Sequence, residues 1–485
     1  MVTGCAADTG GVSAWKTFSQ NIAHAAAHFK DAQTMRHITQ DSGFGLKTEQ
    51  VKRRHILVKA VIIGLVSGGL ACAFRWTLMQ VEHGRTGALA WLRENAHWAA
   101  GLLAAVGIGA AGCALALWLV RRFAPETSGS GIPHLKSVML DQAEMCWWRV
   151  IPVKFAAGVI GIGAGLALGR EGPTIQMGGA TGQMVSRWFR VRGGEGERKA
   201  LMSAGAAAGL SAAFNAPLAG VMFVLEELHG VFAPVLFVAA FVSSVVADIV
   251  CRLLLGASPV FATPSIAAPT LAALPLAAVL GLVCGFGGVA FNKVLLRSLD
   301  WFDGLRARRW PVIAIGALAG AVVGIAAWIC PDVVGSGSHL AEHALGGGLK
   351  VIGVITLMML ARFALTMWSF GSGAAGGIFA PLLVIGALVG LGTGHAVHQV
   401  WPPLVEHPEI FAVIGMGGLL TAIVRAPLTS MVLIIELTGK YDFMLPVLTC
   451  SLIAYGVAEA MNCAPIYESL RLRALEKSAE IAPAA

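Results

Sequence analysis

Charged side chains are scarce in this chain. Of its 485 residues, 13% are Asp, Glu, Lys or Arg, whereas 56% are hydrophobic. Soluble domains are nearer about a quarter charged and about half apolar. The composition therefore excludes an ordinary soluble protein and indicates a surface that faces lipid.

Motifs that mark several other classes of protein are missing. The nine cysteines include no CxxC pair, and we expect no disulfide framework. There is no HExxH, no P-loop and no Ser-His-Asp order, so we expect no enzyme activity, no cofactor and no metal. The net charge of +8 does not indicate nucleic acid, because the basic residues lie mostly at the edges of apolar runs.

Long apolar runs dominate the chain instead. A bilayer span takes about 20 apolar residues. The clearest candidates cover residues 58–78, 99–120, 231–249, 271–291 and 312–329. Shorter runs, broken by Gly or Pro, lie at 173–185, 217–225 and 381–389. We interpret these as partial or tilted helices that neighbouring helices cover, and we expect more than a dozen helical pieces in all.

The sequence also repeats itself. Three blocks recur in the same order, at offsets of 210, 208 and 206 residues: 201–226 as 411–436, 169–182 as 377–390, and 125–131 as 331–337. Such an ordered set predicts an internal duplication. Within the first block Glu226 recurs as Glu436, which indicates a structural role for both.

Charge gives the orientation of the two copies. The loop 186–200 carries five basic residues, whereas its counterpart 394–410 has no Lys or Arg. Basic loops stay in the cytoplasm, so the matching loops lie on opposite sides and the halves are inverted. The alternative is that one loop is basic by accident. Inverted repeats are typical of transporters, with the substrate site near the midplane.

These patterns divide the chain into four parts. We expect a cytoplasmic segment at 1–54, which is polar and has no cleavable secretion signal, and membrane repeats at 55–256 and 257–470. We expect a short cytoplasmic tail at 471–485, with no CBS domains.

Three short motifs share one physical design. They are GSGIP at 129–133, GREGP at 169–173 and GGIFAP at 376–381. In each, glycines precede a proline and an apolar helical run follows. Proline suits the first helical turn, and glycine lets the backbone approach an ion closely. Helix starts expose free N–H groups and a partial positive charge, so several converging starts would hold an anion.

No full positive charge is needed in such a site. A buried Lys or Arg would hold a halide too tightly, whereas dipoles and hydroxyls allow its release. Ser130 supplies a hydroxyl within the first motif, and Tyr467, one of three tyrosines, supplies another after the last apolar run. Taken alone, each Gly or Pro could serve helix packing, and Tyr467 could be an anchor at the membrane interface.

The order and spacing of these motifs resemble the CLC family of chloride channels and transporters, over residues 57–475. The segments 206–210 and 214–220 and the pair Glu226-Glu227 look like the bacterial members. The resemblance implies a chloride held by the hydroxyls of Ser130 and Tyr467 and by the backbone N–H groups of Ile378 and Phe379. A serine at 130 resembles the chloride-preferring members. The supporting motif residues are Gly129, Gly131, Pro133, Arg170, Gly172, Pro173, Gly377 and Pro381.

Two glutamates are the candidates for proton transfer. Glu171 lies in a motif at membrane depth, where an ionisable residue is a functional candidate. Its carboxylate can occupy the same site as chloride, and protonation frees that site. The resemblance makes it the gating glutamate. Glu227 resembles the proton-transferring glutamate of the coupled members, although a solvated carboxylate at a helix end is the alternative.

The sequence therefore predicts an all-α polytopic membrane protein with two inverted repeats whose broken helices meet at a mid-membrane anion site. We expect exchange of chloride for protons; a passive chloride channel of the same family and, more remotely, an intramembrane enzyme are the rivals. By resemblance we expect a homodimer in the bacterial inner membrane, with both termini cytoplasmic.

Overall fold

The described part of the chain is helical. The computed structural model describes residues 53–189, 194–230, 232–256, 261 and 271–481, and these form 17 α-helices and no named strand. The predicted segment 1–54 lies outside the described residues except for its last two positions. The sequence prediction of an all-α fold with more than a dozen helices is confirmed.

The first half runs from α3 to α10. Its helices are α3 (Arg53–Asn95), α4 (Trp98–Phe123), α5 (Ile132–Met139), α6 (Trp147–Gly163), α7 (Glu171–Trp188), α8 (Gly194–Phe214), α9 (Pro217–Phe223) and α10 (Pro234–Leu255). Two short elements join them, the 3-10 turn η1 (Pro125–Thr127) and the π-helical turn η2 (Val224–His229).

The second half runs from α11 to α18 and is followed by α19. Its helices are α11 (Leu274–Ala307), α12 (Val312–Ile329), α13 (Ser338–Leu345), α14 (Ile352–Gly371), α15 (Phe379–Val400), α16 (Glu409–Val424), α17 (Pro427–Thr438), α18 (Met444–Ala460) and α19 (Ile466–Ile481). Its 3-10 turns are η3 (Leu271–Ala273), η4 (Pro331–Val333), η5 (Pro402–Leu404) and η6 (Tyr441–Phe443).

The two halves follow the same order of elements. A long helix, a turn at a PxxxGSG segment and an eight-residue helix recur as α4, η1 and α5 and as α12, η4 and α13. The packing recurs as well. Gly178 of α7 faces Gly205 of α8 with no room for a Cβ atom on either, and their repeat mates Gly386 and Gly415 pack α15 against α16 in the same way.

The helices α4 and α12 meet across the boundary between the halves. Gly109 lies against Gly320, and a Cβ atom on Gly324 would come 2.5 Å from the Ala105 carbonyl oxygen. The partner residue number falls as the number on α4 rises, so the two helices run antiparallel. Small residues let their backbones approach closely, as is common between membrane helices.

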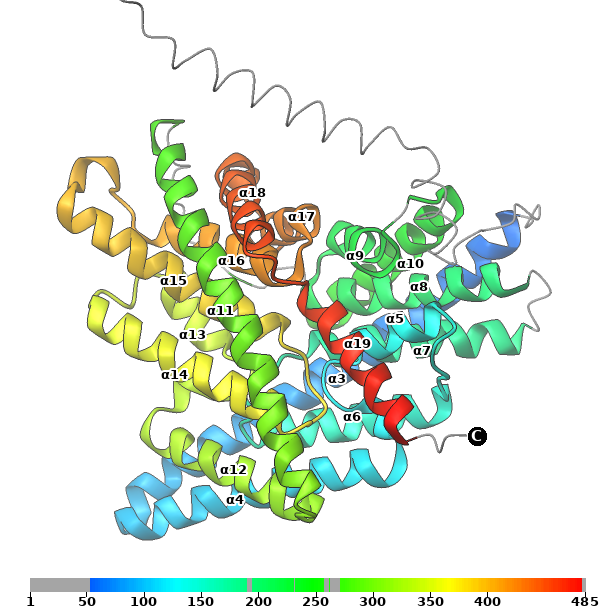
Figure 1. Cartoon of the computed structure of the whole chain (residues 1–485), viewed down its shortest axis with the longest axis horizontal. Coiled ribbons are helices and arrows are strands. Elements are labelled where there is room, and N and C mark those ends of the chain that lie inside the picture. The colour runs from blue at the N-terminus through cyan, green and yellow to red at the C-terminus, as the bar shows by residue number, and fades with distance from the viewer. Residues whose placement is uncertain (1–52, 190–193, 231, 257–260, 262–270, 482–485) are drawn as a thin grey trace, which may run out of the picture. The chain divides into compact units, whose positions relative to one another are not determined.

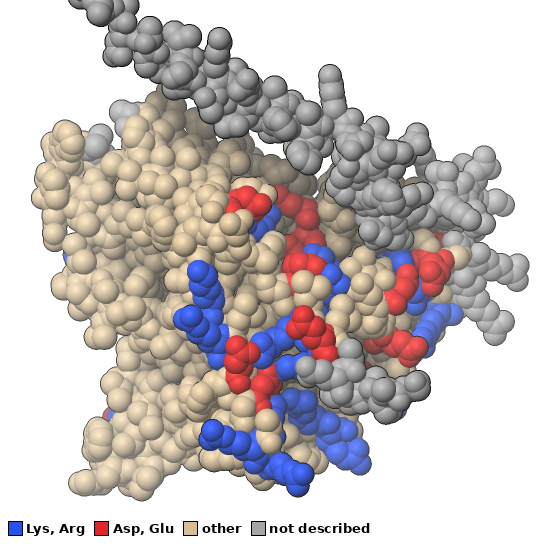
Figure 2. Space-filling view, in the orientation of Figure 1, with Lys and Arg blue, Asp and Glu red and all other residues tan. Residues whose placement is uncertain are grey.

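Much of the surface is apolar. Within the described residues, eight helices are long and apolar enough to cross a membrane. Large hydrophobic side chains such as Leu103, Leu253 and Ile329 are exposed on them. On the face seen in Figure 2, charged side chains gather in the central and lower part, where α19 lies in Figure 1, while the left flank is nearly uncharged. This distribution fits a body surrounded by lipid.

Several helices are longer than the sequence patterns predict. The run at 381–389 belongs to a helix of 22 residues, α15, and not to a short piece. The glycines that suggested a break serve packing: Gly390 and Gly394 lie against the start of α16, next to Phe411 and Pro408. Likewise α3 continues past the apolar run to Asn95, and its last turns line a cavity described below.

Candidate functional site

Three loops from distant parts of the sequence meet at one point. The Gly129 N–H donates to the Ala374 carbonyl oxygen and the Gly376 N–H donates back to the Gly129 oxygen, both at 3.1 Å. Gly169 and Gly377 exchange two further bonds, at 2.7 and 2.8 Å. The three predicted motifs are therefore joined through their backbones. This convergence was expected from their common design and is now seen.

The start of α7 lies directly against Ser130. A Cβ atom on Gly172 would come 2.7 Å from both the carbonyl oxygen and the hydroxyl of Ser130, and 3.0 Å from the Gly377 Cα atom. Only glycine fits at this position without displacing its neighbours. Gly172 thus brings the second motif into contact with the other two.

The glycines of the first motif and the prolines of all three have the predicted local geometry. Gly129 and Gly131 adopt φ values of +64° and +85°, which glycine tolerates and other residues rarely adopt. Pro133, Pro173 and Pro381 all lie in the first turn of their helices, α5, α7 and α15. The prolines therefore remove no helical hydrogen bond.

Glu171 places its carboxylate at the start of α15. The side chain is 1% exposed, and its Oε2 atom accepts a hydrogen bond from the Ala380 N–H at 3.3 Å. Among the described residues, the neighbouring N–H groups of Ile378 and Phe379 have no acceptor. A fixed negative charge therefore lies beside free donors and the positive end of a helix dipole.

Two buried hydroxyls lie beside these donors. We call the N–H groups of Ile378 and Phe379 and the hydroxyls of Ser130 and Tyr467 together the cradle. Ser130 is 2% exposed and Tyr467 is fully buried, and neither hydroxyl has a hydrogen-bond partner within the described residues. Tyr467, the second residue of α19, lies close to Ser130 and to the carboxylates of Glu171 and Glu227. Buried polar groups in proteins are nearly always paired. Two orphan hydroxyls on one cradle therefore indicate a site built for a ligand.

Lys154 binds the backbone of the loop that carries Ser130. It is fully buried on α6, and its Nζ atom donates to the carbonyl oxygens of Thr127 and Gly129, at 2.8 and 2.6 Å. The ammonium holds the backbone of the loop that carries Ser130.

Glu227 lies in a separate group of charges. It belongs to η2, is 7% exposed, and its carboxylate lies 3.1 Å from the Lys136 ammonium of α5. The same ammonium lies 3.5 Å from Glu468, the residue after Tyr467. In the described residues no hydrogen bond joins Glu227 to Ser130 or to Glu171. Lys136 therefore links Glu227 to α19, which carries the tyrosine of the cradle.

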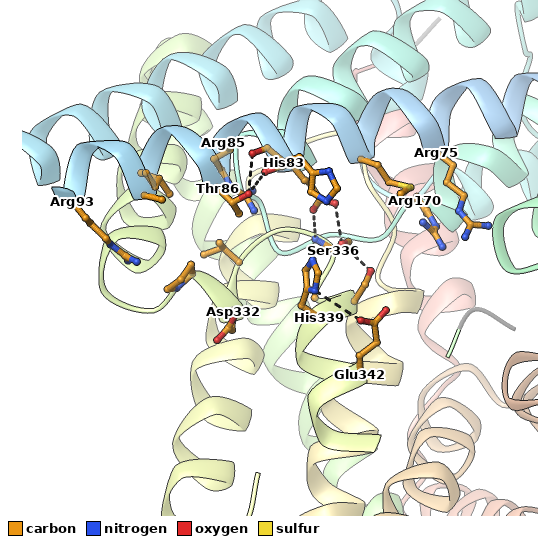
Figure 3. A pocket seen from close by; sticks show the side chains of 18 residues that line it. Arg75, His83, Arg85, Thr86, Arg93, Arg170, Asp332, Ser336, His339 and Glu342 are labelled. Atoms are coloured by element: carbon orange, nitrogen blue, oxygen red, sulfur yellow. Dashed lines mark hydrogen bonds and ion pairs between the residues drawn. The ribbon is translucent and has the colours of Figure 1, made fainter. Parts of the chain in front are cut away.

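Arg170 points away from the cradle. It is partly buried and lines a cavity beside Arg75 of α3 (Figure 3). No hydrogen bond or ion pair to its side chain is found in the part of the chain that the structure describes. Its guanidinium thus faces the cavity while its backbone caps α7.

Sequence reasoning assigned no role to three buried or half-buried charges near the site. Lys154, Arg362 and Lys136 each lie in or beside an apolar run, and an isolated charge of this kind is a signal in its own right. The π-helical turn at Glu227 was not foreseen either, although such turns often occur at functional sites. Among the described residues, no three His, Cys, Asp or Glu side chains gather as metal ligands.

Comparison with known proteins agrees with this geometry. The sequence pattern of the family described as "Voltage gated chloride channel" matches residues 112–459. The "H(+)/Cl(-) exchange transporter ClcA" of Citrobacter koseri is 38% identical over 434 residues, which cover 87% of this chain and 89% of the relative. The protein of the same name from Salmonella agona matches equally well.

Solved structures are similar as well. A "slow cyanobacterial Cl-/H+ antiporter" has a TM-score of 0.82 and 36% sequence identity, over 87% of this chain and 98% of the other. A "eukaryotic CLC transporter", with 23% identity and a TM-score of 0.71 over 86% of this chain and 73% of the other, shares the fold. The chain belongs to the CLC family of voltage gated chloride channels and transporters.

Proposed function

We propose that this protein exchanges chloride for protons across a membrane. Chloride binds between the hydroxyls of Ser130 and Tyr467 and the N–H groups of Ile378 and Phe379. Glu171 gates this site, and Glu227 passes protons to and from it.

The position of the Glu171 carboxylate carries the proposal. It accepts the Ala380 N–H at the start of α15, next to the free donors of Ile378 and Phe379. A chloride ion at the same helix start would meet the same dipole and the carboxylate's own charge. The two anions therefore compete. Protonation removes the charge of Glu171, so one side chain can link the movement of a proton to that of chloride.

The cradle favours binding that is weak enough for turnover. Its direct donors are amides and hydroxyls, and the buried ammonium of Lys154 contacts carbonyl oxygens of the loop instead of the cradle's centre. Dipoles in a dry site attract an anion without the full strength of an ion pair.

Glu227 favours an exchanger over a passive channel. It is a buried carboxylate held by Lys136, which is a poor arrangement for a merely solvated helix end. Relatives that are 38% identical are named as H+/Cl- exchange transporters. Tyr467 lies near both glutamates, so we propose that protons pass between them beside the chloride site.

The remaining features of the proposal follow the family. The protein acts as a homodimer with one pathway in each subunit, in the inner membrane of a bacterium, with both termini in the cytoplasm. Its membrane repeats cover 55–256 and 257–470, between the segment 1–54 and the tail 471–485. The exposed side chains of Leu218 and Leu428, at the starts of α9 and α17, offer apolar surface for the subunit contact.

Simultaneous measurement of both ions in liposomes tests the proposal. A chloride gradient is expected to drive protons uphill through the wild-type protein. In Glu171→Gln and Glu171→Ala, chloride still flows and proton movement is lost. A wild-type protein that passes chloride without moving protons would be a channel, and the exchange proposal would be wrong.

Glu227→Gln is expected to uncouple the ions in the same assay. Glu226→Gln is the matched control, because it neutralises the adjacent carboxylate without touching Lys136. Equal loss of coupling in both variants would argue for a general effect of charge and against a specific proton route through Glu227.

A further inference from the structure

A second turn in the molecule has the geometry of the chloride cradle. Gly335 and Gly337 have φ values of +66° and +78°, close to the +64° and +85° of Gly129 and Gly131. Each turn follows a 3-10 element and leads into an eight-residue helix, α5 in one case and α13 in the other. The turn 335–337, which we call the second turn, is the repeat mate of the turn at Ser130.

A buried cation supports both turns in the same way. Arg362 on α14 is fully buried and lies 208 residues after Lys154. Its guanidinium donates to the carbonyl oxygens of Val333 and Ser336, at 3.0 and 2.8 Å, as Lys154 does to its own loop. The Nε atom of Arg362 is buried without a hydrogen-bond partner. The second turn therefore has a buried positive charge beside it, as the turn at Ser130 does.

The two turns differ in what fills them. The Ser130 hydroxyl is free, whereas Ser336 binds the carboxylate of Glu82 from α3. The Ser336 N–H donates to Oε1 at 2.9 Å and its hydroxyl to Oε2 at 3.2 Å. A Cβ atom at Gly335 would come 2.6 Å from Oε1, so glycine leaves the space that the carboxylate occupies.

This carboxylate lies on the wall of a cavity of about 340 Å³ between α3 and the start of α13 (Figure 3). Basic side chains line much of that cavity: Arg75, Arg85, Arg93 and Arg170. Its acidic side chains are Glu82, Asp332 and Glu342, and Asp332 and Glu342 are exposed. Solution anions therefore have an open and largely basic route to the second turn.

We infer that the second turn is a second anion site and that Glu82 is its built-in occupant. Arg85 and Arg362 both lie close to Glu82, and without its charge they would remain near an empty cradle. A buried cation without a counter-ion is costly. A halide from the cavity replaces the carboxylate when Glu82 is removed. In the wild-type protein, Glu82 keeps solution anions out of the second turn.

Bromide located by anomalous scattering tests this inference. In crystals of Glu82→Ala soaked in bromide, a peak is expected beside the Ser336 N–H that is missing from wild-type crystals. The cradle at Ser130 serves as an internal reference. Bromide at Ser130 but not at Ser336 in the variant would overturn the inference and leave the proposed exchange intact. Bromide at Ser336 in the wild type would overturn it too, because Glu82 would then not be the occupant.

Thermal unfolding in bromide provides a second measurement. Glu342→Ala is the matched control, because it removes one carboxylate from the same cavity without touching the second turn. The midpoint of Glu82→Ala is expected to rise by about 2 °C more than that of the control for each tenfold increase in bromide above its Kd. If Glu82→Ala does not fold, Glu82→Ser also vacates the space of the carboxylate and is compared with Glu342→Ser. If the unfolding midpoint rises equally with bromide concentration in a Glu82 variant and in its Glu342 control, a second anion site is contradicted.

Discussion

The carboxylates of Glu226 and Glu436 each cap the start of a helix in the other half. The Glu436 carboxylate accepts the N–H groups of Leu218 and Ala219, at 3.0 and 2.8 Å, at the start of the helix that leads to Glu226. Glu226 accepts those of Leu428 and Thr429 at the start of α17, at 3.2 and 2.7 Å. The helices α9 and α17 are therefore antiparallel, and the axis that relates them is perpendicular to both. This is the geometry of inverted repeats.

Removing one of these caps should lower stability without affecting coupling. A lost cap costs about 1 kcal/mol, and hydrogen bonds to a charged group contribute about 1.5–3 kcal/mol. We expect Glu436→Ala to lower the free energy of unfolding by about 2 kcal/mol, measured by thermal unfolding in detergent. The proton-to-chloride ratio in liposomes should stay at the wild-type value. A changed ratio would place Glu436 in the transport pathway and contradict a purely structural role.

Tyr467→Phe should separate stability from binding. The hydroxyl is buried and unpartnered, so its loss leaves no polar group unsatisfied. We expect the variant to be at least as stable as the wild type in chloride-free buffer. Its affinity for chloride should fall about tenfold, the equivalent of about 1.4 kcal/mol for one hydrogen bond. Calorimetric titration with chloride provides the measurement, and an unchanged affinity would remove Tyr467 from the site.

Lys136 is expected to position Glu227 for proton transfer. It bridges that carboxylate to Glu468 on α19, at 3.1 and 3.5 Å. In Lys136→Met the bridge is lost, and the proton-to-chloride ratio should fall. Lys136→Arg keeps the charge and should restore much of the ratio. If both variants lose coupling equally, the position matters for packing and not for the ion pair.

Glu468 should make a pH-dependent contribution to stability. It lies outside the spans, and its hydrogen bond to Arg471 holds the pKa of the carboxyl below its usual value. A lowered folded-state pKa stabilises the protein above the unfolded value, about 4.3, and this stabilisation disappears as the pH falls through the folded value. The wild type should therefore exceed Glu468→Gln by about 1 kcal/mol near neutral pH. Unfolding scans should show the two converging below about pH 4. A constant difference would exclude titration of Glu468.

Much of the fold could be predicted because glycines and prolines recur at nearly constant offsets in the two halves. The repeat offsets pair Gly178 with Gly386 and Gly205 with Gly415. Gly178 packs against Gly205 in the first half, and Gly386 packs against Gly415 in the second. The length of α15 could not be predicted, because a glycine that breaks a helix and one that admits a neighbouring helix look alike in sequence.

The cradle could be predicted because its donors belong to motifs with a clear physical design. The supporting charges could not. The roles of Lys154 and Arg362 depend on the carbonyl oxygens that they bind, 25 to 29 residues away in the sequence. Glu82 binds a serine 254 residues away. Contacts of such separation leave no periodic pattern in a single sequence.

The packing of α4 against α12 has a consequence for the origin of the chain. Gly109 and Gly320, which meet there, lie on matching helices of the two halves. Contacts of this kind are self-complementary, as in a symmetric dimer. A half-length ancestor would have buried this helix against a second molecule inserted in the opposite direction. We expect that gene fusion later fixed those two orientations in one polypeptide.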